Sequence, residues 1–450
     1  MSELFDKIVS LSKRRGFIFP SCEIYGGLAN AYDYGHYGTL LKDNIKNLWF
    51  KRFVQDRTDI FRVESSIILN PKVWEASGHV KTFCDVMIED TVTNKRYRAD
   101  HLIEEFFHNQ GVERNVDGLT PEELQNIIDE NQILSPDGNP LSKARKFNLL
   151  FETEIGIVEG DGNKAYLRGE IAQGIFLNFK NIMDSLSPKL PFGIAQAGKA
   201  FRNEISKGQF TFRTLEFDLM EFEYFFDPEN NNWEELFDYW QEKIMNFALE
   251  CGLDKEKLRF RDHEDFELSH YSKRTIDLEY KFPWGYKEMF ALAYRTDFDL
   301  KNHQEQSKQN LNYVYPDGKK VTPHVLEPTF GLSRLMTILL MDSYTEEDVD
   351  GSQRVFLQLP FDLAPVKYAI LPLVKKPELI EVANKIYEKL SEKYNCEVHL
   401  SGSIGKRYRK QDEIGTPYCI TVDFDSLEDG CVTVRDRDSL NQERVSIDTL

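Results

Sequence analysis

Apolar residues recur at helical spacing in two long segments of the chain. Leu41, Ile45 and Leu48 fall on one face of a helix predicted over residues 39–54. Residues 233–251 show the same spacing and predict a second amphipathic helix. An apolar stripe of this kind packs against the core of its own domain or against a partner. The periodicity of 39–54 fits both arrangements.

Other segments alternate in the manner of strands. Strands are predicted at 60–69, 165–170, 288–300 and 321–327, and a further helix at 171–179. The first strand is expected to stop at Pro71 and the last at Pro328, because proline supplies no N–H to a sheet ladder. Residues 25–38 are rich in glycine and tyrosine, so we predict a loop packed on a flat surface.

The most informative stretch is Phe201-Arg202-Asn203-Glu204. On an extended strand Arg202 and Glu204 share one face, so a cation and a carboxylate face the same ligand. A short loop containing Lys207 and Gly208 separates this stretch from a second aromatic run, 212–226, which predicts an antiparallel hairpin with a mobile tip. The pair suits a phosphate and an adenine amino group, although a cross-strand ion pair in an ordinary sheet has the same sequence.

A second candidate follows the strand at 321–327. Gly331-Leu332-Ser333-Arg334 opens a helix that is almost wholly apolar and therefore buried. An arginine in the first turn of a buried helix needs a partner. A phosphate held at the helix N-terminus and a buried carboxylate both meet that need.

Changes in polarity and in predicted secondary structure along the chain indicate its domain organisation. Residues 85–149 are polar and mostly helical, with Thr120 as N-cap, Pro121 at the first helical position and Glu123 completing a capping box. After 350 the pattern changes to strands at 368–373, 396–400, 418–422 and 431–434 with a helix at 377–394, which indicates a small α/β domain. This domain contains the densest basic run, Lys406-Arg407-Tyr408-Arg409-Lys410, which suits RNA or a solvated loop.

Composition narrows the class of protein. The 450 residues carry a formal net charge of −19, so RNA contacts must be local rather than spread over the whole surface. The sequence shows no apolar run of membrane-spanning length and no signal-peptide pattern, so we expect a cytoplasmic protein without a membrane partner. Its six cysteines lack metal-site spacing, so neither structural zinc nor a disulfide scaffold is expected.

Together these segments resemble the class II aminoacyl-tRNA synthetases, and within them the dimeric glycyl-tRNA synthetases, over nearly the whole chain. The second motif of the class resembles residues 201–204 with Arg213 and Glu216-Phe217, and the third resembles residues 327–334. Stretches similar to the glycyl enzymes are 25–29, 74–79, 98–104 and Glu170 with 172–176. The combination is specific, whereas each motif alone is weak.

The resemblance implies an α+β fold. Residues 1–84 and 150–350 would form a catalytic domain built on a mostly antiparallel sheet flanked by helices. A helical insertion is expected at 85–149 and a C-terminal α/β anticodon-binding domain at 355–450. The helix at 39–54 and the following strand would form the interface of a homodimer. The implied activity is ATP-dependent attachment of glycine to its tRNA through a glycyl-adenylate, with ATP and Mg²⁺ and without zinc.

The resemblance also implies roles for individual residues. Arg202 and Arg334 would be catalytic, Glu204 would accept from the adenine amine, and Phe217 would stack on the ring. The expected ATP site comprises Arg202, Asn203, Glu204, Phe212, Arg213, Phe217, Glu288, Met289, Gly331 and Arg334. The expected amino-acid site comprises Arg98, Glu170, Phe217, Glu221, Glu327, Thr329 and Gly331, with Glu170 for the ammonium and Arg98 for the carboxylate. Glu327 and Glu288 would bind magnesium, and Lys406, Arg407, Arg409 and Lys410 would contact tRNA.

The chain departs from the family pattern near the predicted amino-acid site. Gly169 and Ile171 stand where the family has Pro and Thr, and Thr329 stands for Ser. Leu219, Phe290, Ala291 and Tyr294 replace Gln, Glu, Gly and Asn. The added bulk at Thr329 and Ala291 predicts a cavity that remains small.

Two other readings stay open at this point. The chain could activate a different amino acid, or it could be a non-catalytic, nucleic-acid-binding relative. A binding-only relative has no chemical reason to keep Arg202, Glu204, Glu327 and Arg334 together, so the sequence favours an enzyme.

Overall fold

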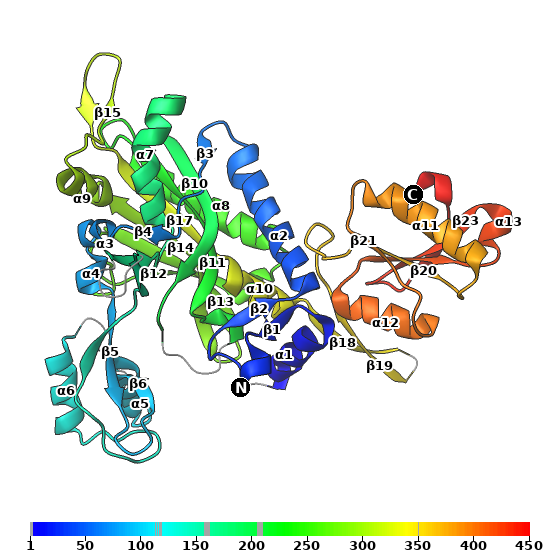
Figure 1. Cartoon of the computed structure of the whole chain (residues 1–450), viewed down its shortest axis with the longest axis horizontal. Helices are drawn as coiled ribbons and strands as arrows, with labels where there is room; N and C mark the ends of the chain where they lie inside the picture. The colour runs from blue at the N-terminus through cyan, green and yellow to red at the C-terminus, as the bar shows by residue number, and fades with distance from the viewer. Residues whose placement is uncertain are drawn as a thin grey trace.

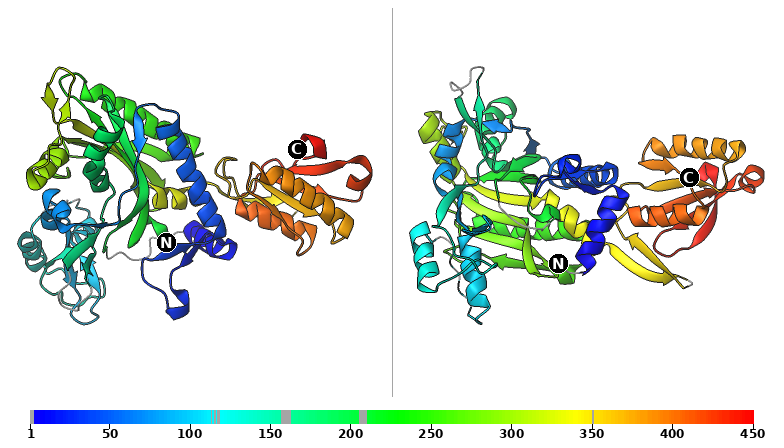
Figure 2. Two further views of the ribbon diagram at one scale, coloured as in Figure 1. Left: turned by 45° about the horizontal axis from the view of Figure 1, so that its top comes forward. Right: turned by 60° about the horizontal axis from the view of Figure 1, so that its bottom comes forward.

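The computed structural model of the chain describes residues 3–112, 114, 116, 119–156, 163–204, 210–349 and 351–450, without the side chains of residues 81 and 82. Figure 1 shows a central body, an inserted subdomain coloured cyan and a C-terminal domain coloured orange to red. Both views of Figure 2 place the insertion and the C-terminal domain on opposite sides of the central body.

The central body is built on a seven-stranded sheet in the order β12-β13-β14-β17-β11-β10-β3. Its strands are β3 (Ile60–Arg62), β10 (Phe192–Phe201), β11 (Glu216–Phe226), β12 (Leu258–Asp262), β13 (Arg274–Phe282), β14 (Gly285–Thr296) and β17 (His324–Gly331). All neighbours are antiparallel except β3 and β10. The mostly antiparallel sheet expected for the class is therefore confirmed.

Helices cover both faces of this sheet. They are α1 (Glu3–Arg15), α2 (His36–Phe50), α7 (Ala172–Leu186), α8 (Trp233–Glu250), α9 (Phe298–Ser307) and α10 (Leu332–Asp342). One core joins α1, α2, α8 and α10 to one face of the sheet, and a smaller core joins α7 and the start of α9 to the other. The stripe of α2 is buried in the first core, so its periodicity reflects packing within its own domain.

Smaller elements complete the body. They are β1 (Ile18–Pro20), β2 (Tyr32–Tyr34), β4 (Ile68–Leu69), β8 (Glu152–Ile155), β9 (Asn163–Leu167), β15 (Tyr313–Val314), β16 (Lys320–Val321), β18 (Tyr344–Val349), β19 (Ser352–Leu357), α3 (Pro71–Ala76), α4 (His79–Thr82), the 3-10 helices η1 (Glu23–Tyr25), η3 (Phe210–Phe212) and η4 (Lys255–Lys257), and the π-helical turn η2 (Lys51–Gln55). Where the described chain is concerned, no helix has both the length and the apolar character needed to cross a membrane.

Two sequence predictions about the body were wrong in detail. The expected strand 60–69 is two short strands in different sheets, because the chain leaves the large sheet after Val63. Strand β4 ends at Leu69, so the predicted stop before Pro71 is confirmed, although Pro71 also begins a helix. Pro71 occupies the first position of α3, where Asn70 caps the N–H of Lys72 at 3.0 Å. The predicted loop 25–38 contains strand β2 and the first three residues of α2.

Pro328, by contrast, lies inside a strand rather than at its end. It pairs with Leu292 of β14, and the ladder between β17 and β11 is interrupted between Leu326 and Thr329. The missing N–H of Pro328 therefore falls where no ladder bond is made. The segment 288–300 divides at Thr296 into the end of β14 and the start of α9.

The inserted subdomain is not the helical unit that the sequence predicted. Its helices α5 (Ala99–His108) and α6 (Pro121–Glu130) pack on a three-stranded antiparallel sheet of β5 (Cys84–Glu89), β6 (Arg96–Arg98) and β7 (Arg145–Asn148). The capping box at Thr120 is confirmed, since its hydroxyl accepts from the N–H of Glu123 at 3.3 Å and the Glu123 carboxylate accepts from its N–H at 2.8 Å. The sequence did not predict these strands, because they are short and lie among charged residues.

The C-terminal unit is the α/β domain that the sequence predicted. It contains β20 (Tyr368–Pro372), β21 (Cys396–Val398), β22 (Tyr418–Val422), β23 (Cys431–Asp436), β24 (Gln442–Ser446), α11 (Pro377–Ser391), α12 (Ile404–Ile414), α13 (Ser426–Asp429) and η5 (Ile447–Thr449). The sheet order is β21-β20-β22-β23-β24. The basic run lies on α12, so it is helical rather than a loop.

Candidate active site

The predicted hairpin is present, with a longer connection than expected. β10 and β11 pair antiparallel from Phe192↔Phe225 to Phe201↔Glu216. Arg202 and Glu204 therefore lie just beyond the end of β10 rather than on it. The hairpin tip at 205–209, with Lys207 and Gly208, lies outside the described residues.

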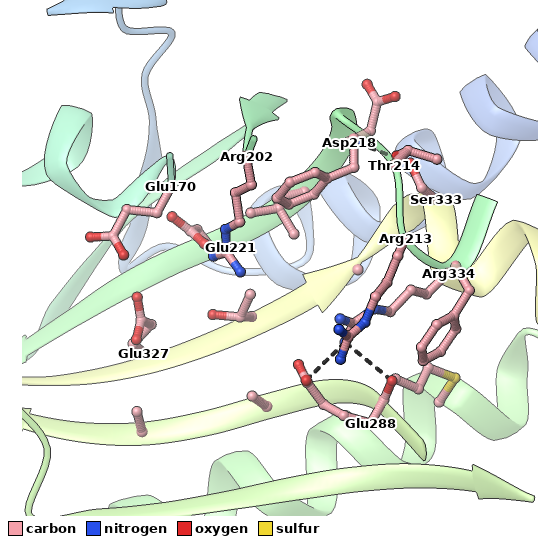
Figure 3. Close-up of a pocket in the computed structure, with 18 of the residues that line it drawn as sticks. Glu170, Arg202, Arg213, Thr214, Asp218, Glu221, Glu288, Glu327, Ser333 and Arg334 are labelled. Carbon is pink, nitrogen blue, oxygen red and sulfur yellow. Dashed lines mark hydrogen bonds and ion pairs between the residues drawn. The ribbon is translucent and has the colours of Figure 1, made fainter. Parts of the chain in front are cut away.

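A pocket lies beside the C-terminal half of this hairpin connection, over β11, β14 and β17. The predicted residues that line it are Glu170, Arg202, Glu204, Phe212, Arg213, Phe217, Glu221, Glu288, Met289, Glu327, Thr329, Gly331 and Arg334. Figure 3 shows Glu170, Glu221 and Glu327 gathered at one end, and Arg213, Arg334 and Glu288 at the other. The pocket therefore has an acidic end and an end rich in arginine.

The floor of the acidic end is fixed by strand register. Glu221 on β11 pairs with Thr329 on β17, and Thr329 pairs in turn with Ala291 on β14. Paired residues project from the same face of a sheet, so these three side chains lie side by side in the pocket. Here Thr329 and Ala291 supply short side chains directly beside a buried carboxylate.

Because side chains alternate between the two faces of β14, the residues that depart from the family pattern do not all lie near the amino-acid site. Phe290 and Tyr294 face away from Ala291 and pack in the core under α8, where Tyr294 stacks on Trp233 at 4.7 Å between ring centroids. They do not line the pocket. Leu219, Ala291 and Thr329 do, so these are the departures that shape the site.

Glu170 is held by three side chains. His79 places Nε2 at 3.1 Å from its carboxylate, Gln173 donates to it at 2.9 Å, and Arg295 lies 3.7 Å away. Burial alone raises a carboxyl pKa, but the charges of His79 and Arg295 hold the pKa of Glu170 below its usual value. Glu170 is therefore an ionised carboxylate inside the pocket.

Arg295 is the cation on which the buried acids converge. Its side chain is 1% exposed and donates to Asp299 at 2.8 Å and to Glu327 at 2.9 Å, while its guanidinium lies 3.8 Å from the ring centre of Tyr271. A buried cation needs such partners to offset the cost of leaving water. Sequence analysis placed Arg295 on a strand and assigned it no role.

Three glutamates form a compact buried cluster at this end. One carboxylate oxygen from each of Glu221, Glu223 and Glu327 lies within 4.8 Å of the others. Within the described residues, Oε1 of Glu221 and both carboxylate oxygens of Glu223 have no hydrogen-bond partner. Burial, with the charges of Glu170 and Asp299, raises the pKa of Glu327 to about 7 despite the opposing charge of Arg295. Burial and Glu327 likewise raise the pKa of Glu221 well above its usual value. The cluster is suited to a cationic group.

At the other end, Arg334 lies in the first turn of α10 and reaches β14. It pairs with the carboxylate of Glu288 at 2.8 Å and donates to the Glu288 carbonyl at 3.2 Å. Its guanidinium also lies 4.8 Å from the ring centre of Phe212. The carboxylate alternative raised by the sequence is thus present, and the same arginine still faces the pocket beside Arg213 (Figure 3).

Arg202 stands between the two ends. Its Nε donates to the carbonyl of Gly169 at 3.0 Å, and its guanidinium lies 5.2 Å from the ring centres of both Phe217 and Phe83. Gly169 directly precedes Glu170. The backbone next to the Glu170 carboxylate is therefore in contact with the arginine predicted to hold phosphate.

Some predicted site residues are not brought together. Arg98 pairs with Asp100, its Nε lying 3.1 Å from the carboxylate, and lines a neighbouring cleft rather than the pocket of Glu170. Asn203 also lies outside the pocket lining and donates its N–H to the carbonyl of Leu149 at 2.8 Å. Their assignments to the amino-acid and ATP sites therefore gain no support from the pocket lining and stay predictions.

The two predicted magnesium ligands, Glu288 and Glu327, lie apart from each other. Glu288 pairs with Arg334, whereas Glu327 pairs with Arg295 at the acidic end. Figure 3 shows them at different ends of the pocket. A shared ion between these two carboxylates is therefore not supported, because each belongs to a different charged group.

The residues of the basic run in the C-terminal domain also differ in their exposure and contacts. Arg407 is 4% exposed and donates to the carbonyls of Pro372, His399 and Leu373 at 2.7, 2.9 and 3.0 Å. Its guanidinium binds backbone, so the assignment of Arg407 to tRNA is corrected. Lys406 is exposed on the same helix.

Residues that sequence reasoning missed are His79, Gln173, Glu223, Arg295 and Asp299. Gln173 and Glu223 were visible in the sequence as polar residues inside otherwise apolar or aromatic segments, whereas His79 and Asp299 lie among polar neighbours. A buried polar side chain in such a segment needs a partner, which is the signal that could have found Gln173 and Glu223.

Comparison with known proteins agrees with this geometry. The tRNA synthetase class II core domain (G, H, P, S and T) matches residues 151–343, and the anticodon binding domain matches residues 367–450. A solved prolyl-tRNA synthetase from Cryptosporidium parvum, complexed with halofuginone and AMPPNP, superposes with a TM-score of 0.64 at 13% sequence identity. The match covers 99% of this chain and 73% of that one, and at such low identity it establishes the fold alone.

Curated relatives are much more similar in sequence. The glycine–tRNA ligase of Clostridium acetobutylicum is 50% identical over 450 residues, covering 99% of this chain and 96% of that protein. The glycine–tRNA ligase of Acetivibrio thermocellus is 50% identical over 454 residues, covering 100% of this chain and 97% of that protein. The chain therefore belongs to the glycine–tRNA ligase family of class II aminoacyl-tRNA synthetases.

Proposed function

We propose that the chain attaches glycine to its tRNA in two steps. Glycine and ATP first form a glycyl-adenylate with release of pyrophosphate, and the glycyl group then passes to the terminal ribose of tRNA. The observation that carries this proposal is a single pocket with glutamates at one end and arginines at the other. Such a reaction needs no covalent protein nucleophile, so positioning and electrostatics would supply the catalysis.

At the acidic end, Glu170 would bind the ammonium of glycine. Glu221 and Glu327 surround the same space and would share the positive charge. Thr329 and Ala291 on the floor would fill the volume that a side chain on the α-carbon requires. A methyl group that fits or clashes in a pocket changes discrimination by about 1–3 kcal/mol.

At the arginine end, Arg213 and Arg334 would bind the outer phosphates of ATP. Phe217 would stack on adenine and Glu204 would accept from its amino group. Arg202 lies between both ends, where the glycine carboxylate attacks the α-phosphate, and would stabilise the charge that develops there.

Magnesium fits one of the two predicted ligands. The Glu288 carboxylate lies beside Arg334 at the phosphate end, and a hard oxygen donor there suits Mg²⁺ held mainly by ATP phosphates. Bound Mg²⁺ would neutralise phosphate charge. Glu327 is engaged by Arg295 at the acidic end, and we propose it for the amino acid instead.

The remaining proposals concern partners and organisation. We place the domain limits at 1–84 with 150–350, 85–149 and 355–450, in a cytoplasmic enzyme. Lys406, Arg409 and Lys410 on α12 would contact tRNA. Two chains would associate through α2 and residues 60–71. Light scattering at micromolar concentration tests the dimer, and a fully active monomer would exclude it.

Pyrophosphate exchange with each of the twenty amino acids tests the function. Glycine should support exchange, and alanine and serine should do so about a hundredfold less well, from the upper part of the methyl-discrimination range. Exchange with another amino acid while glycine is inert would reassign the substrate. Exchange with none of them would favour a non-catalytic, nucleic-acid-binding role.

A further inference from the structure

Two chain segments connect the inserted subdomain to the central body, and we call them the neck: residues 79–83, which include α4, and residues 149–150 (Figure 1). The segments are joined, because the N–H of Leu149 donates to the carbonyl of Phe83 at 3.2 Å. The Leu149 carbonyl in turn accepts from the N–H of Asn203 at 2.8 Å. The neck is thus hydrogen-bonded to the backbone that directly follows Arg202.

The ring of Phe83 makes a second contact with this region. Its centre lies 5.2 Å from the guanidinium carbon of Arg202, which has Phe217 at the same distance. A cation beside aromatic faces is attracted by their quadrupoles. With Nε bound to the carbonyl of Gly169 at 3.0 Å, the guanidinium is held by two rings and one backbone oxygen.

Gly169 is what allows the neck to come this close. A Cβ atom at residue 169 would lie 3.1 Å from Cε1 of Phe83 and 3.0 Å from Cδ2 of Leu150. Both distances are tighter than ordinary carbon contacts, so any side chain here would push the neck away. The glycine in this position, where the family pattern has proline, is matched to the packing of Phe83.

The same neck segment also contacts the acidic end. His79 is 4% exposed, and its Nε2 lies 3.1 Å from the carboxylate of Glu170. Its Nδ1 is hydrogen-bonded to the Ser77 hydroxyl at 2.8 Å, and its ring packs edge-on against Phe83 at 5.2 Å. One segment of five residues therefore contacts Glu170 through a histidine and Arg202 through a phenylalanine.

We propose that the neck is a positioning element for adenylate formation, in which His79 fixes Glu170 and Phe83 fixes Arg202. The two substrate-binding ends of the pocket are then held in one arrangement by a segment that also carries the inserted subdomain. A displacement of the insertion would move both groups together. This inference rests on the proposed function for its chemistry, and on the contacts above for its geometry.

The test compares three variants in pyrophosphate exchange and in calorimetric binding of a non-hydrolysable ATP analogue. Phe83→Leu removes the ring and should weaken both by about tenfold, the size of one cation–π contact. Phe83→Tyr keeps the ring and should remain within about twofold of wild type. Val73→Ala, in the same apolar cluster, should lower stability without changing either readout.

A double-mutant cycle separates positioning from simple destabilisation. In an Arg202→Lys background, Phe83→Leu should have little further effect, because the planar cation that the ring holds is gone. The same loss in both backgrounds, or wild-type behaviour of Phe83→Leu, would overturn the inference. If the wild type lacks glycine-dependent exchange, the proposed function fails. The effect of Phe83→Leu on analogue binding still decides the role of the neck.

Discussion

Arg295 donates from Nη1 to the carboxylate of Glu327 at 2.9 Å, with both side chains buried at the acidic end of the pocket. The pair joins β14 to β17, and Asp299 and Glu170 add their charges to the same guanidinium. The acidic end is therefore built around a cation that itself does not line the pocket.

Replacing Arg295 by methionine should strongly destabilise the protein. The change keeps much of the volume but leaves buried carboxylates without their cation, which costs roughly 3–5 kcal/mol. Urea unfolding followed by circular dichroism measures the difference, with Arg295→Lys as the matched variant that keeps the charge. A loss below about 1 kcal/mol for the methionine variant would contradict the network as described.

Glu170→Gln should impair glycine binding more than ATP binding. The amide keeps the shape and its contact with Gln173 but removes the negative charge proposed to face the ammonium. We expect KM for glycine in pyrophosphate exchange to rise by at least about tenfold, since a charge-assisted hydrogen bond contributes more than a neutral one. An equal rise in both KM values would place Glu170 in general packing instead.

Arg334→Ala and Arg202→Ala should each abolish adenylate formation while the fold is retained. Each substitution removes a cation proposed to act on phosphate charge as it develops, an effect of about a hundredfold or more. Exchange rates and circular dichroism together test this expectation. Lys385→Ala, on the exposed face of α11, is the control. Activity within a few-fold of wild type for either arginine variant would remove its role.

Glu223 makes stability depend on pH. Burial and the nearby charge of Glu327 raise its pKa well above the usual 4.5. A carboxyl group with a raised folded-state pKa contributes stability below 4.5, and that contribution is lost as the pH rises above this value. Glu223→Gln should therefore gain stability over the wild type as the pH increases, by at most about 1.4 kcal/mol per pH unit.

Urea unfolding of both proteins at a series of pH values between 4 and 8 measures this difference. Glu388→Gln, at an exposed position of α11, serves as the control and should show no such trend. A constant difference between wild type and Glu223→Gln across the series would mean that Glu223 does not take up a proton on folding.

Substitutions on the basic helix α12 should have different effects at the buried Arg407 and at the other three basic residues. Changing Lys406, Arg409 and Lys410 to alanine should weaken tRNA binding and reduce the slope of log Kd against log salt by about one per lost phosphate contact. Glycine-dependent exchange should stay unchanged. Arg407→Ala should instead destabilise the domain, because three backbone carbonyls lose their donor. An unchanged salt slope in the triple variant would exclude this helix as the contact.

The sequence by itself determined the elements whose residues repeat with a strong period. The hairpin of β10 and β11, the helices α2 and α8 and the C-terminal α/β unit all follow from alternation or helical spacing. Motif resemblance also identified most of the residues that line the pocket. Short strands such as β5 and β7 were missed, because a few residues among charged neighbours carry no clear period.

Only the tertiary structure decided which polar groups meet. Arg295, Glu327 and Glu170 come from distant segments, and periodicity indicates the face of each strand but not its neighbour. Strand register then placed Ala291 in the pocket and Phe290 in the core, one residue apart. Arg98 pairs with Asp100 two residues away, whereas Arg407 binds the carbonyl of Pro372 from a distant strand, and the sequence alone does not show which kind of contact an arginine makes.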